Sequence, residues 1–374
     1  MFTIVKKPVS EITEYLTQYG AGLKTTKFPH TYLIKFNSET QMNHPAINQL
    51  RGLIFNDETG MIYSMSYPVP LEFKDQSLEE QQKLITTIKT NQYTVQEALD
   101  GTLIRLWYHN ETGQWVTSTN GKCDAYESFW MNGVSYGELF STTLQGVLEN
   151  LNQDHVYMFT LCHPLNVIVV NHTAPRIYHV ATYDRVTQKE IECELGIEHP
   201  PVVNLTVDEV MDSVGSSQGT PVLSAGYMVV QEDTDGVVRR YRFENVNYTR
   251  GRILRGESNN IDYILLGHML EKDESKLKEF LLYYPIYVAT HGQLSTRMNQ
   301  LARVLYQDYG QRYKMKVNIF VHPRHHKFLG EIHTQVYLTL LKPQNKTVQL
   351  HDIVNFIRAQ PVARVLYLLN YIYD

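Results

Sequence analysis

The stretch EALDGTLI, residues 97–104, decides the fold because it ends one short β-type segment and opens a β-hairpin. The hairpin joins LIRLWYH (103–109) to QWVTST (114–119) through the turn NETG. Residues 227–243 repeat this arrangement, with YMVVQ and VVRRYRF on either side of EDTDG. Short loops that contain glycine favour hairpins between alternating runs. We therefore expect two antiparallel hairpins.

The surrounding chain has two parts of different character. From about residue 32 to 248, short β-type runs alternate with turn signals, and helical patterns occur at 77–90 and 136–152. This mixture predicts an α+β domain with antiparallel sheets. After about residue 260, apolar residues recur at i, i+3 and i+4, which predicts helices. We therefore expect an α+β domain at residues 1–252 and an all-helical domain at 253–374.

The composition is that of an ordinary globular protein, with 374 residues, 43% hydrophobic and 20% charged. It excludes disordered, collagen-like and disulfide-rich miniproteins. No apolar run approaches the roughly 18 residues of a membrane span, and we expect no secretory signal. Cys123, Cys162 and Cys193 lack the spacing of a disulfide framework or zinc ribbon, so we expect a reducing compartment, the cytoplasm. The net charge of −5 gives no overall support for nucleic-acid binding.

Four further segments accompany the 97–104 stretch. They are LRGLIF (50–55), FTLCHP (159–164), AGYMVV (225–230) and RYRFEN (240–245). In order and spacing the five segments resemble the motifs of covalent nucleotidyltransferases, in particular ATP-dependent RNA ligases of the phage T4 RNA ligase 1 type. The resemblance covers about residues 30–250, and PVARVLYLLN (361–370) is similar to the end of viral ligases of this type. It implies a nucleotidyltransferase-like domain with antiparallel sheets, a helical second domain, a viral source and a role in RNA repair.

The chemistry of that family explains which residues it needs. A neutral lysine in a Lys-x-Asp-Gly motif attacks the α-phosphorus of ATP and forms a lysyl-adenylate. Carboxylates bind the magnesium ion that neutralises the triphosphate. Two lysines on the last strand stabilise the charge on the α-phosphate. The adenylate then passes to an RNA 5′-phosphate, and a 3′-hydroxyl displaces AMP.

This sequence differs from the family at each of these reacting positions. The lysine, the two carboxylates and the two last-strand lysines are replaced by Ala98, Thr160, Ala225, Arg242 and Glu244, with the last strand aligned on Asn245 and Tyr248. Alanine has no lone pair, so no lysyl-adenylate can form at that position. Arg242 remains protonated and could hold a phosphate, whereas Glu244 would repel one. The remaining parts of the nucleotide pocket are Arg51, Gly52, Asp100, Gly101 and Arg242.

Several other residues could carry chemistry. Lys74 and Lys122 could replace the missing nucleophile, but neither is followed by Asp-Gly at the required offset. The candidate phosphate contacts are Arg239, Arg240, Arg250, Arg252 and Arg255, for which solvated charge near a domain boundary is the alternative. His322, His325 and His326 lack the further ligands of a zinc site, so we expect no metal. We expect Cys162 to be a buried thiol.

The sequence therefore predicts an RNA-ligase-like protein that is catalytically inactive and acts as an RNA-binding or protein-binding scaffold. We expect no resident cofactor and no membrane association. One alternative is an active ligase that uses ATP, magnesium and an unrecognised lysine to join 5′-phosphate and 3′-hydroxyl RNA ends. Another is a structural or interaction protein without a nucleic-acid role.

Overall fold

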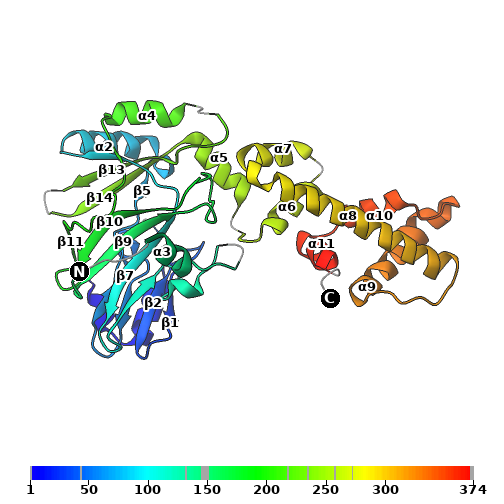
Figure 1. The fold of residues 1–374 in the computed structure, drawn as a ribbon, viewed down its shortest axis with the longest axis horizontal. Helices are drawn as coiled ribbons and strands as arrows, with labels where there is room; N and C mark the ends of the chain where they lie inside the picture. The colour runs from blue at the N-terminus through cyan, green and yellow to red at the C-terminus, as the bar shows by residue number, and fades with distance from the viewer. Residues whose placement is uncertain are drawn as a thin grey trace. The chain divides into compact units, whose positions relative to one another are not determined.

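The computed structural model describes residues 2–42, 44–130, 133–144, 151–216, 219–233, 236–256, 258–271 and 273–370. The chain forms two compact units, Met1–Arg252 and Ile253–Asp374 (Figure 1). The first contains antiparallel sheets and helices, and the second is helical. The expected α+β class is thereby confirmed.

Three sheets build the first unit. In spatial order the first sheet holds β1 (Gly22–Thr25), β2 (Thr31–Lys35), β3 (Ile54–Asn56) and β4 (Ile62–Ser64). The second holds β11 (Lys189–Ile191), β10 (Arg176–Asp184), β9 (His155–Cys162), β7 (Thr102–His109) and β8 (Gln114–Ser118). The third holds β12 (Val202–Val203), β6 (Thr94–Glu97), β13 (Gly226–Glu232), β14 (Val238–Glu244) and β5 (Leu71–Glu72). Among the described residues, the strand pairings are antiparallel except that of β14 with β5.

The helices of the first unit lie between or after these strands. They are α1 (Val9–Thr17), α2 (Leu78–Lys89), α3 (Tyr136–Leu144), α4 (Val207–Gly215) and α5 (Val246–Arg255), with 3-10 turns η1 (Thr3–Lys6), η2 (Asn48–Leu50), η3 (Phe73–Asp75) and η4 (Ala125–Glu127). Both expected hairpins form, as β7–β8 and β13–β14. The expected helices at 77–90 and 136–152 correspond to α2 and α3. Residues 145–150 of the latter lie outside the described part, and residues 151–152 are not helical. A capping box between Ser77 and Glu80 starts α2.

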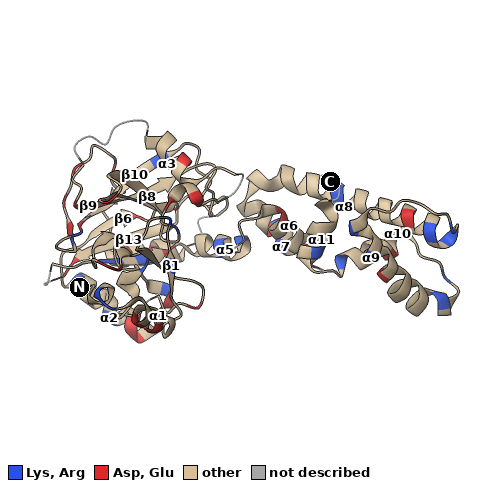
Figure 2. Ribbon diagram, turned by 90° about the horizontal axis from the view of Figure 1, so that it is seen from below, with Lys and Arg blue, Asp and Glu red and all other residues tan. Residues whose placement is uncertain are grey.

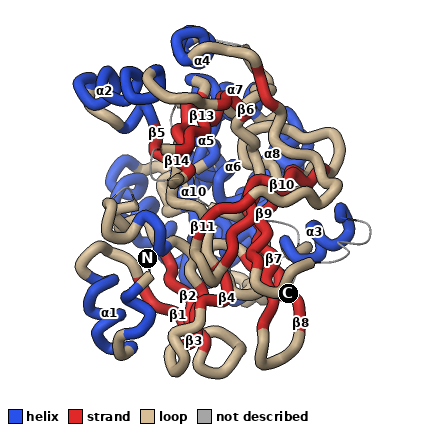
Figure 3. The backbone as a smooth tube through the Cα atoms, turned by 90° about the vertical axis from the view of Figure 1, so that its left-hand side faces the viewer, coloured by secondary structure: helices blue, strands red, loops and turns tan. Residues whose placement is uncertain are grey.

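Three hydrophobic clusters separate the layers. Trp107 and Met158 of the second sheet pack against the first sheet, and Phe159 on the opposite face packs against α3. In the third sheet, Tyr241 and Phe243 pack under α2 and α4. Figures 1 and 3 show α2 and α4 on the side of the third sheet that faces away from the second sheet. The other face of the third sheet is thus available for a site.

The second unit consists of helical segments. They are α6 (Ile261–Leu270), α7 (Glu274–Tyr283), η5 (Pro285–Tyr287), α8 (Val288–Tyr309), η6 (Gly310–Lys314), α9 (Pro323–Glu331), η7 (Ile332–Leu341), η8 (Lys342–Gln344), α10 (Leu350–Arg358) and α11 (Val362–Leu369). The segments η6 and η7 have π-helical geometry. Figure 2 shows several Lys and Arg positions near α9 and α10. In the described residues, no helix is long and apolar enough to cross a membrane.

Candidate functional site

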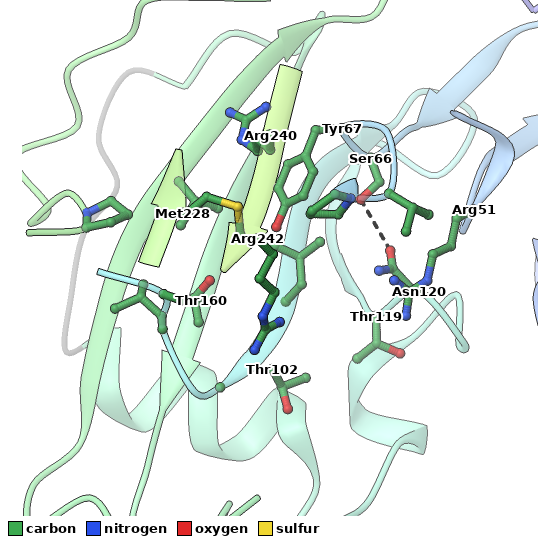
Figure 4. Close-up of a pocket in the computed structure, with 18 of the residues that line it drawn as sticks. Arg51, Ser66, Tyr67, Thr102, Thr119, Asn120, Thr160, Met228, Arg240 and Arg242 are labelled. Atoms are coloured by element: carbon green, nitrogen blue, oxygen red, sulfur yellow. Dashed lines mark hydrogen bonds between the residues drawn. The ribbon is translucent and has the colours of Figure 1, made fainter. Parts of the chain in front are cut away.

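A pocket of about 440 Å³ lies between the second and third sheets (Figure 4). Strands β7, β9, β13 and β14 contribute to its walls, together with loops around residues 66–70, 97–101 and 119–121. Of the positions singled out from the sequence, Arg51, Ala98, Gly101, Thr160, Arg240 and Arg242 line this pocket. The fold therefore brings together segments that are distant in the sequence.

Ala98 lies directly after β6, at the position where the resemblance expects the reactive lysine. Its N–H donates a hydrogen bond to the carbonyl oxygen of Gly226 at 2.9 Å. The residue is 6% exposed and lines the pocket. The backbone at this position is thus held in place by β13, but the side chain offers only a methyl group.

The positions of the two expected carboxylates are neutral and buried. Thr160 on β9 lines the same pocket. Ala225, just before β13, lines a neighbouring cavity of about 280 Å³ together with Ala98. Among the described residues there is no group of three or more His, Cys, Asp or Glu side chains that could hold a metal ion. The residues at these two positions therefore do not suit a divalent cation.

The described lining of the pocket is more basic than acidic. Its cations are Arg51, Arg240 and Arg242, its carboxylate is Glu97, and it includes no lysine. In Figure 4 the Arg242 side chain extends toward Thr102. Guanidinium groups bind phosphate well but are not nucleophiles at neutral pH. This lining can hold an anion, but it offers no amine to attack one.

Glu244 carries a negative charge at the end of β14. Its side chain is fully buried and accepts hydrogen bonds from Lys74, from Arg252 Nη1 at 2.5 Å and from Thr249 Oγ1 at 3.0 Å. Arg242 Nε lies 3.4 Å from Glu244 Oε1. Burial alone would raise the pKa of Glu244, but Arg242, Lys74 and Arg252 together hold it below the ordinary value. Glu244 is therefore an ionised carboxylate within a cluster of three cations.

The two lysines considered as substitute nucleophiles do not line the pocket. Lys74 binds Glu244, and its Nζ is also 3.3 Å from Thr249 Oγ1. Lys122 follows Gly121 and is anchored by its backbone N–H, which donates to Thr119 Oγ1 at 3.1 Å. An ammonium in an ion pair is protonated and cannot attack phosphorus.

The two other pocket arginines differ in their partners. Arg240 makes two hydrogen bonds with Glu190, at 2.9 and 2.5 Å, and its guanidinium lies 4.5 Å from the centre of the Tyr67 ring. Arg51 is half-buried, and it makes no hydrogen bond or ion pair with any residue in the described ranges. Burial lowers the pKa of Arg51. Arg51 is the pocket cation whose charge is available to a ligand.

Asp100 and Gly101 have structural roles in this fold. The Asp100 carboxylate accepts hydrogen bonds from the backbone N–H groups of Val169 and Val170 at 2.9 and 2.6 Å, and from the Tyr248 hydroxyl at 2.8 Å. A Cβ atom on Gly101 would lie 2.5 Å from the Leu161 carbonyl oxygen. Asp100 therefore ties the loop after Ala98 to residues 169–170 and to α5, and Gly101 lets this loop pack closely on β9.

Arg105 supports the pocket and was not expected from the sequence. It is fully buried on β7, where it donates to the carbonyl oxygens of Gly52 and of Thr119, the latter at 2.8 Å. Gly52 has a φ of +73° and packs against Asn120. Burial lowers the pKa of Arg105 to about 9. Arg105 thus joins two pocket loops. The alternation of residues along this strand did not indicate that a charged side chain would point into the interior.

The remaining candidate phosphate contacts lie elsewhere. Arg239 pairs with Asp233 at 2.8 Å, Arg252 binds Glu244, and Arg250 is exposed on α5. Arg255 is buried in the second unit, where it donates to the Ser258 carbonyl oxygen at 2.7 Å. Of the five candidates, Arg240 alone is in the described lining of the pocket.

The histidine group and the cysteine considered from the sequence have local roles. His322 caps α9, His325 is buried, and His326 bonds to Arg312 at 2.9 Å. Burial and the nearby Asp100 raise the pKa of the Cys162 thiol to about 12. This thiol is therefore protonated at neutral pH and is a poor nucleophile.

Comparison with known proteins finds viral relatives of low identity. No protein-family model matches the chain. It is 21% identical over 295 residues to an immediate-early protein ICP-46 homolog of Invertebrate iridescent virus 3, covering 75% of this chain and 64% of that protein. It is 28% identical over 134 residues to the homolog of Invertebrate iridescent virus 6, covering 35% and 28%. The chain thus spans less than two thirds of the length of these curated relatives.

Solved structures to which the chain is similar include ATP-dependent ligases. An archaeal ATP-dependent RNA ligase is 11% identical, with 78% of this chain and 79% of that chain covered and a TM-score of 0.43. A putative ATP-dependent DNA ligase from Aquifex aeolicus is 12% identical, with 77% and 74% covered and a TM-score of 0.42. A Naegleria gruberi RNA ligase variant with AMP and Mn is 12% identical, with 50% and 57% covered and a TM-score of 0.35.

Proposed function

We propose that this protein is a ligase-like nucleotidyltransferase fold that has lost covalent catalysis and acts as an RNA-binding scaffold. The observation that carries the proposal is the pocket, whose described lining contains no lysine and has Ala98 at the position of the expected nucleophile. Thr160 and Ala225, at the positions of the expected carboxylates, offer a metal ion no charge. The first step of ligation needs both the amine and the metal.

The ion pairs around the pocket also argue against tight binding of a triphosphate. Arg240 is paired with Glu190, and Arg242 with Glu244. A triphosphate would have to compete with these carboxylates, and Arg51 is the cation left without one in the described lining. We therefore expect ATP to bind more weakly than millimolar, which corresponds to less than about 4 kcal/mol.

An active ligase remains the alternative, with Lys74 or Lys122 moved into the pocket. The ion pair of Lys74 with Glu244 disfavours this, since the lysine would have to give up its bond to a buried carboxylate. The viral relatives support a viral source and a role in the host cytoplasm. RNA is the partner that the motif resemblance implies, and a partner protein is the alternative occupant of the scaffold.

A single incubation tests both halves of the proposal. The purified chain is mixed with labelled single-stranded RNA that carries a 5′-phosphate and a 3′-hydroxyl, together with ATP and magnesium. Half of each sample is run on a native gel and half on a denaturing gel. We expect a shifted complex on the native gel and RNA of unchanged length on the denaturing gel. Joined or circular RNA would contradict the loss of catalysis, and the absence of a shift would contradict RNA binding.

A further inference from the structure

The two units carry charge of opposite sign. Residues 1–252 contain 19 Lys and Arg and 29 Asp and Glu, whereas residues 253–374 contain 15 and 10. Within the second unit the excess lies in residues 303–346, which hold eight Lys and Arg and two acids, Asp308 and Glu331. Glu331 is already paired with Arg364 at 2.7 Å. The net charge of −5 therefore conceals a basic region.

Side-chain contacts hold this basic region together. Arg312 Nη1 lies 2.9 Å from His326 Nε2, which links η6 to α9. Lys314 Nζ donates to the Val348 carbonyl oxygen at 2.8 Å, which links η6 to the segment before α10. These two bonds hold the cations of η6 beside His326 of α9 and beside Val348. We call this region, residues 310–349, the basic end.

The cations of the basic end are not neutralised by acids. Lys316, Lys327 and Lys342 are exposed and make no hydrogen bond or ion pair with any residue that the structure describes. Arg312 and Lys314 bond to a histidine ring and a carbonyl oxygen, which leave their positive charge in place. Cations that no acid neutralises give this stretch a positive potential, which attracts anions.

Aromatic and apolar side chains lie among these cations. Phe320 is 86% exposed in the connection between η6 and α9, which also holds the exposed Met315. The rings of Tyr313 and His333 are stacked with centroids 4.1 Å apart, and His333 is stacked on Tyr337 at 5.3 Å. Cations interleaved with available rings form the kind of surface on which single-stranded nucleic acids bind, with phosphates on the cations and bases on the rings.

We propose that the basic end of the second unit binds single-stranded RNA, an inference that rests on the proposed scaffold function and assigns its RNA site outside the ligase-like pocket. Each nucleotide presents one phosphate and one planar base, which matches a surface that carries lysines, the exposed ring of Phe320 and the partly exposed rings of Tyr313 and Tyr337. An anionic membrane surface suits this end less well, because the most exposed apolar residue, Phe320, lies in a connecting segment and not on an amphipathic helix face.

The test measures binding of a fluorescein-labelled, unstructured RNA to the full chain by anisotropy over a series of KCl concentrations. The test variant combines Lys316→Glu, Lys327→Glu and Lys342→Glu. The control variant combines Lys35→Glu, Lys83→Glu and Lys189→Glu, which are exposed lysines of the first unit without ion pairs in the described residues. Both variants change the net charge equally, and circular dichroism confirms that each is folded.

We expect the test variant to bind RNA at least tenfold more weakly than the control variant. Its log–log salt slope should be smaller by roughly 2, since each phosphate contact on a single strand contributes about 0.7. Phe320→Ala should weaken binding about tenfold with an unchanged slope, because stacking involves no counterion release.

Equal affinities and slopes for the two triple variants would overturn the assignment to the basic end, while RNA binding by the scaffold would stand. Failure of the wild-type chain to bind RNA would overturn both. Binding to anionic vesicles without RNA binding, or salt-dependent self-association that involves the acidic first unit, would likewise replace RNA with another occupant.

Discussion

Glu244, at a position where the resemblance expects a lysine, places a negative charge at the end of β14. Glu244 is buried and binds Lys74 and Arg252, with Arg242 Nε at 3.4 Å. Three cations around one carboxylate resemble the cations that would surround a phosphate. At the scale of the residue, Glu244 thus acts as an internal anion that satisfies these cations.

Removal of this internal anion should make the cluster bind an external one. We expect Glu244→Gln to bind pyrophosphate at least tenfold more tightly than the wild-type chain, because Lys74, Arg242 and Arg252 lose their shared carboxylate. Isothermal calorimetry at low salt measures the two affinities. Glu14→Gln is the control, since Glu14 is exposed and makes no ion pair in the described residues. Equal affinities of the two variants would show that the cluster does not compete with ligands.

The same residue should contribute to the pH dependence of stability. The pKa of Glu244 is lower in the folded chain than its unfolded value, which is about 4.3. Its contribution to the free energy of unfolding is therefore complete above that unfolded value and is lost as the pH falls through the folded one. We expect the stability difference between wild type and Glu244→Gln, measured by urea unfolding, to shrink from pH 7 toward acid. A difference that is constant with pH would contradict this.

For individual residues, the sequence predicts adjacent motif positions but not long-range hydrogen-bond partners. The missing nucleophile at Ala98 could be identified because its motif neighbours, Asp100 and Gly101, are adjacent in sequence. The partners of Asp100 could not, since its carboxylate binds the backbone of Val169 and Val170, some 70 residues away. Arg105 was missed for the same reason, because its hydrogen-bond acceptors belong to loops that only the fold brings near.

At the scale of the element, local sequence patterns were sufficient to predict the hairpins. They were not sufficient to predict the order of the strands in the sheets. The β7–β8 and β13–β14 hairpins follow from alternation and a short turn. The pairing of β14 with β5, which is parallel, joins segments about 170 residues apart and has no local signal. That non-local pairing places Lys74, just after β5, beside Glu244.

The loop after Ala98 offers a matched test of its packing. Gly101→Ala should lower the free energy of unfolding by about 1–3 kcal/mol, because the added Cβ would lie 2.5 Å from the Leu161 carbonyl oxygen. Gly121→Ala is the control, since a Cβ there meets nothing within 4 Å. Urea denaturation compares the two. Equal midpoints would contradict the close packing of this loop on β9.

At the scale of the whole molecule, the positions where the resemblance expects the lysine and the carboxylates come from separate segments, and Ala98 lines both of the neighbouring cavities that Thr160 and Ala225 line. Ala98→Lys alone should therefore form no lysyl-adenylate, because Thr160 and Ala225 would still provide no carboxylate for the metal. Incubation of this variant with α-labelled ATP and magnesium, followed by denaturing electrophoresis, checks the expectation. Label on the variant, but not on Ala98→Gln, would show that the other replacements matter little.

The net charge of the whole chain did not reveal how charge is distributed between the two units. A total of −5 gave no support to nucleic-acid binding, but the second unit has 15 basic and 10 acidic residues. In the fold, Arg312 and Lys314 join η6 to α9 and to the segment before α10, within the stretch that holds the exposed lysines. Counting charge by unit, once the boundary is known, is what reveals the proposed RNA site.

The most direct test of lost catalysis uses the wild-type chain. Purified protein is incubated with α-labelled ATP and either magnesium or manganese, then denatured and separated by electrophoresis, with a ligase that contains the intact Lys-x-Asp-Gly motif labelled in parallel. We predict label on the intact ligase and none on this chain. Label that stays on this chain and maps to Lys74 or Lys122 would contradict the central claim and identify an active ligase with a displaced lysine.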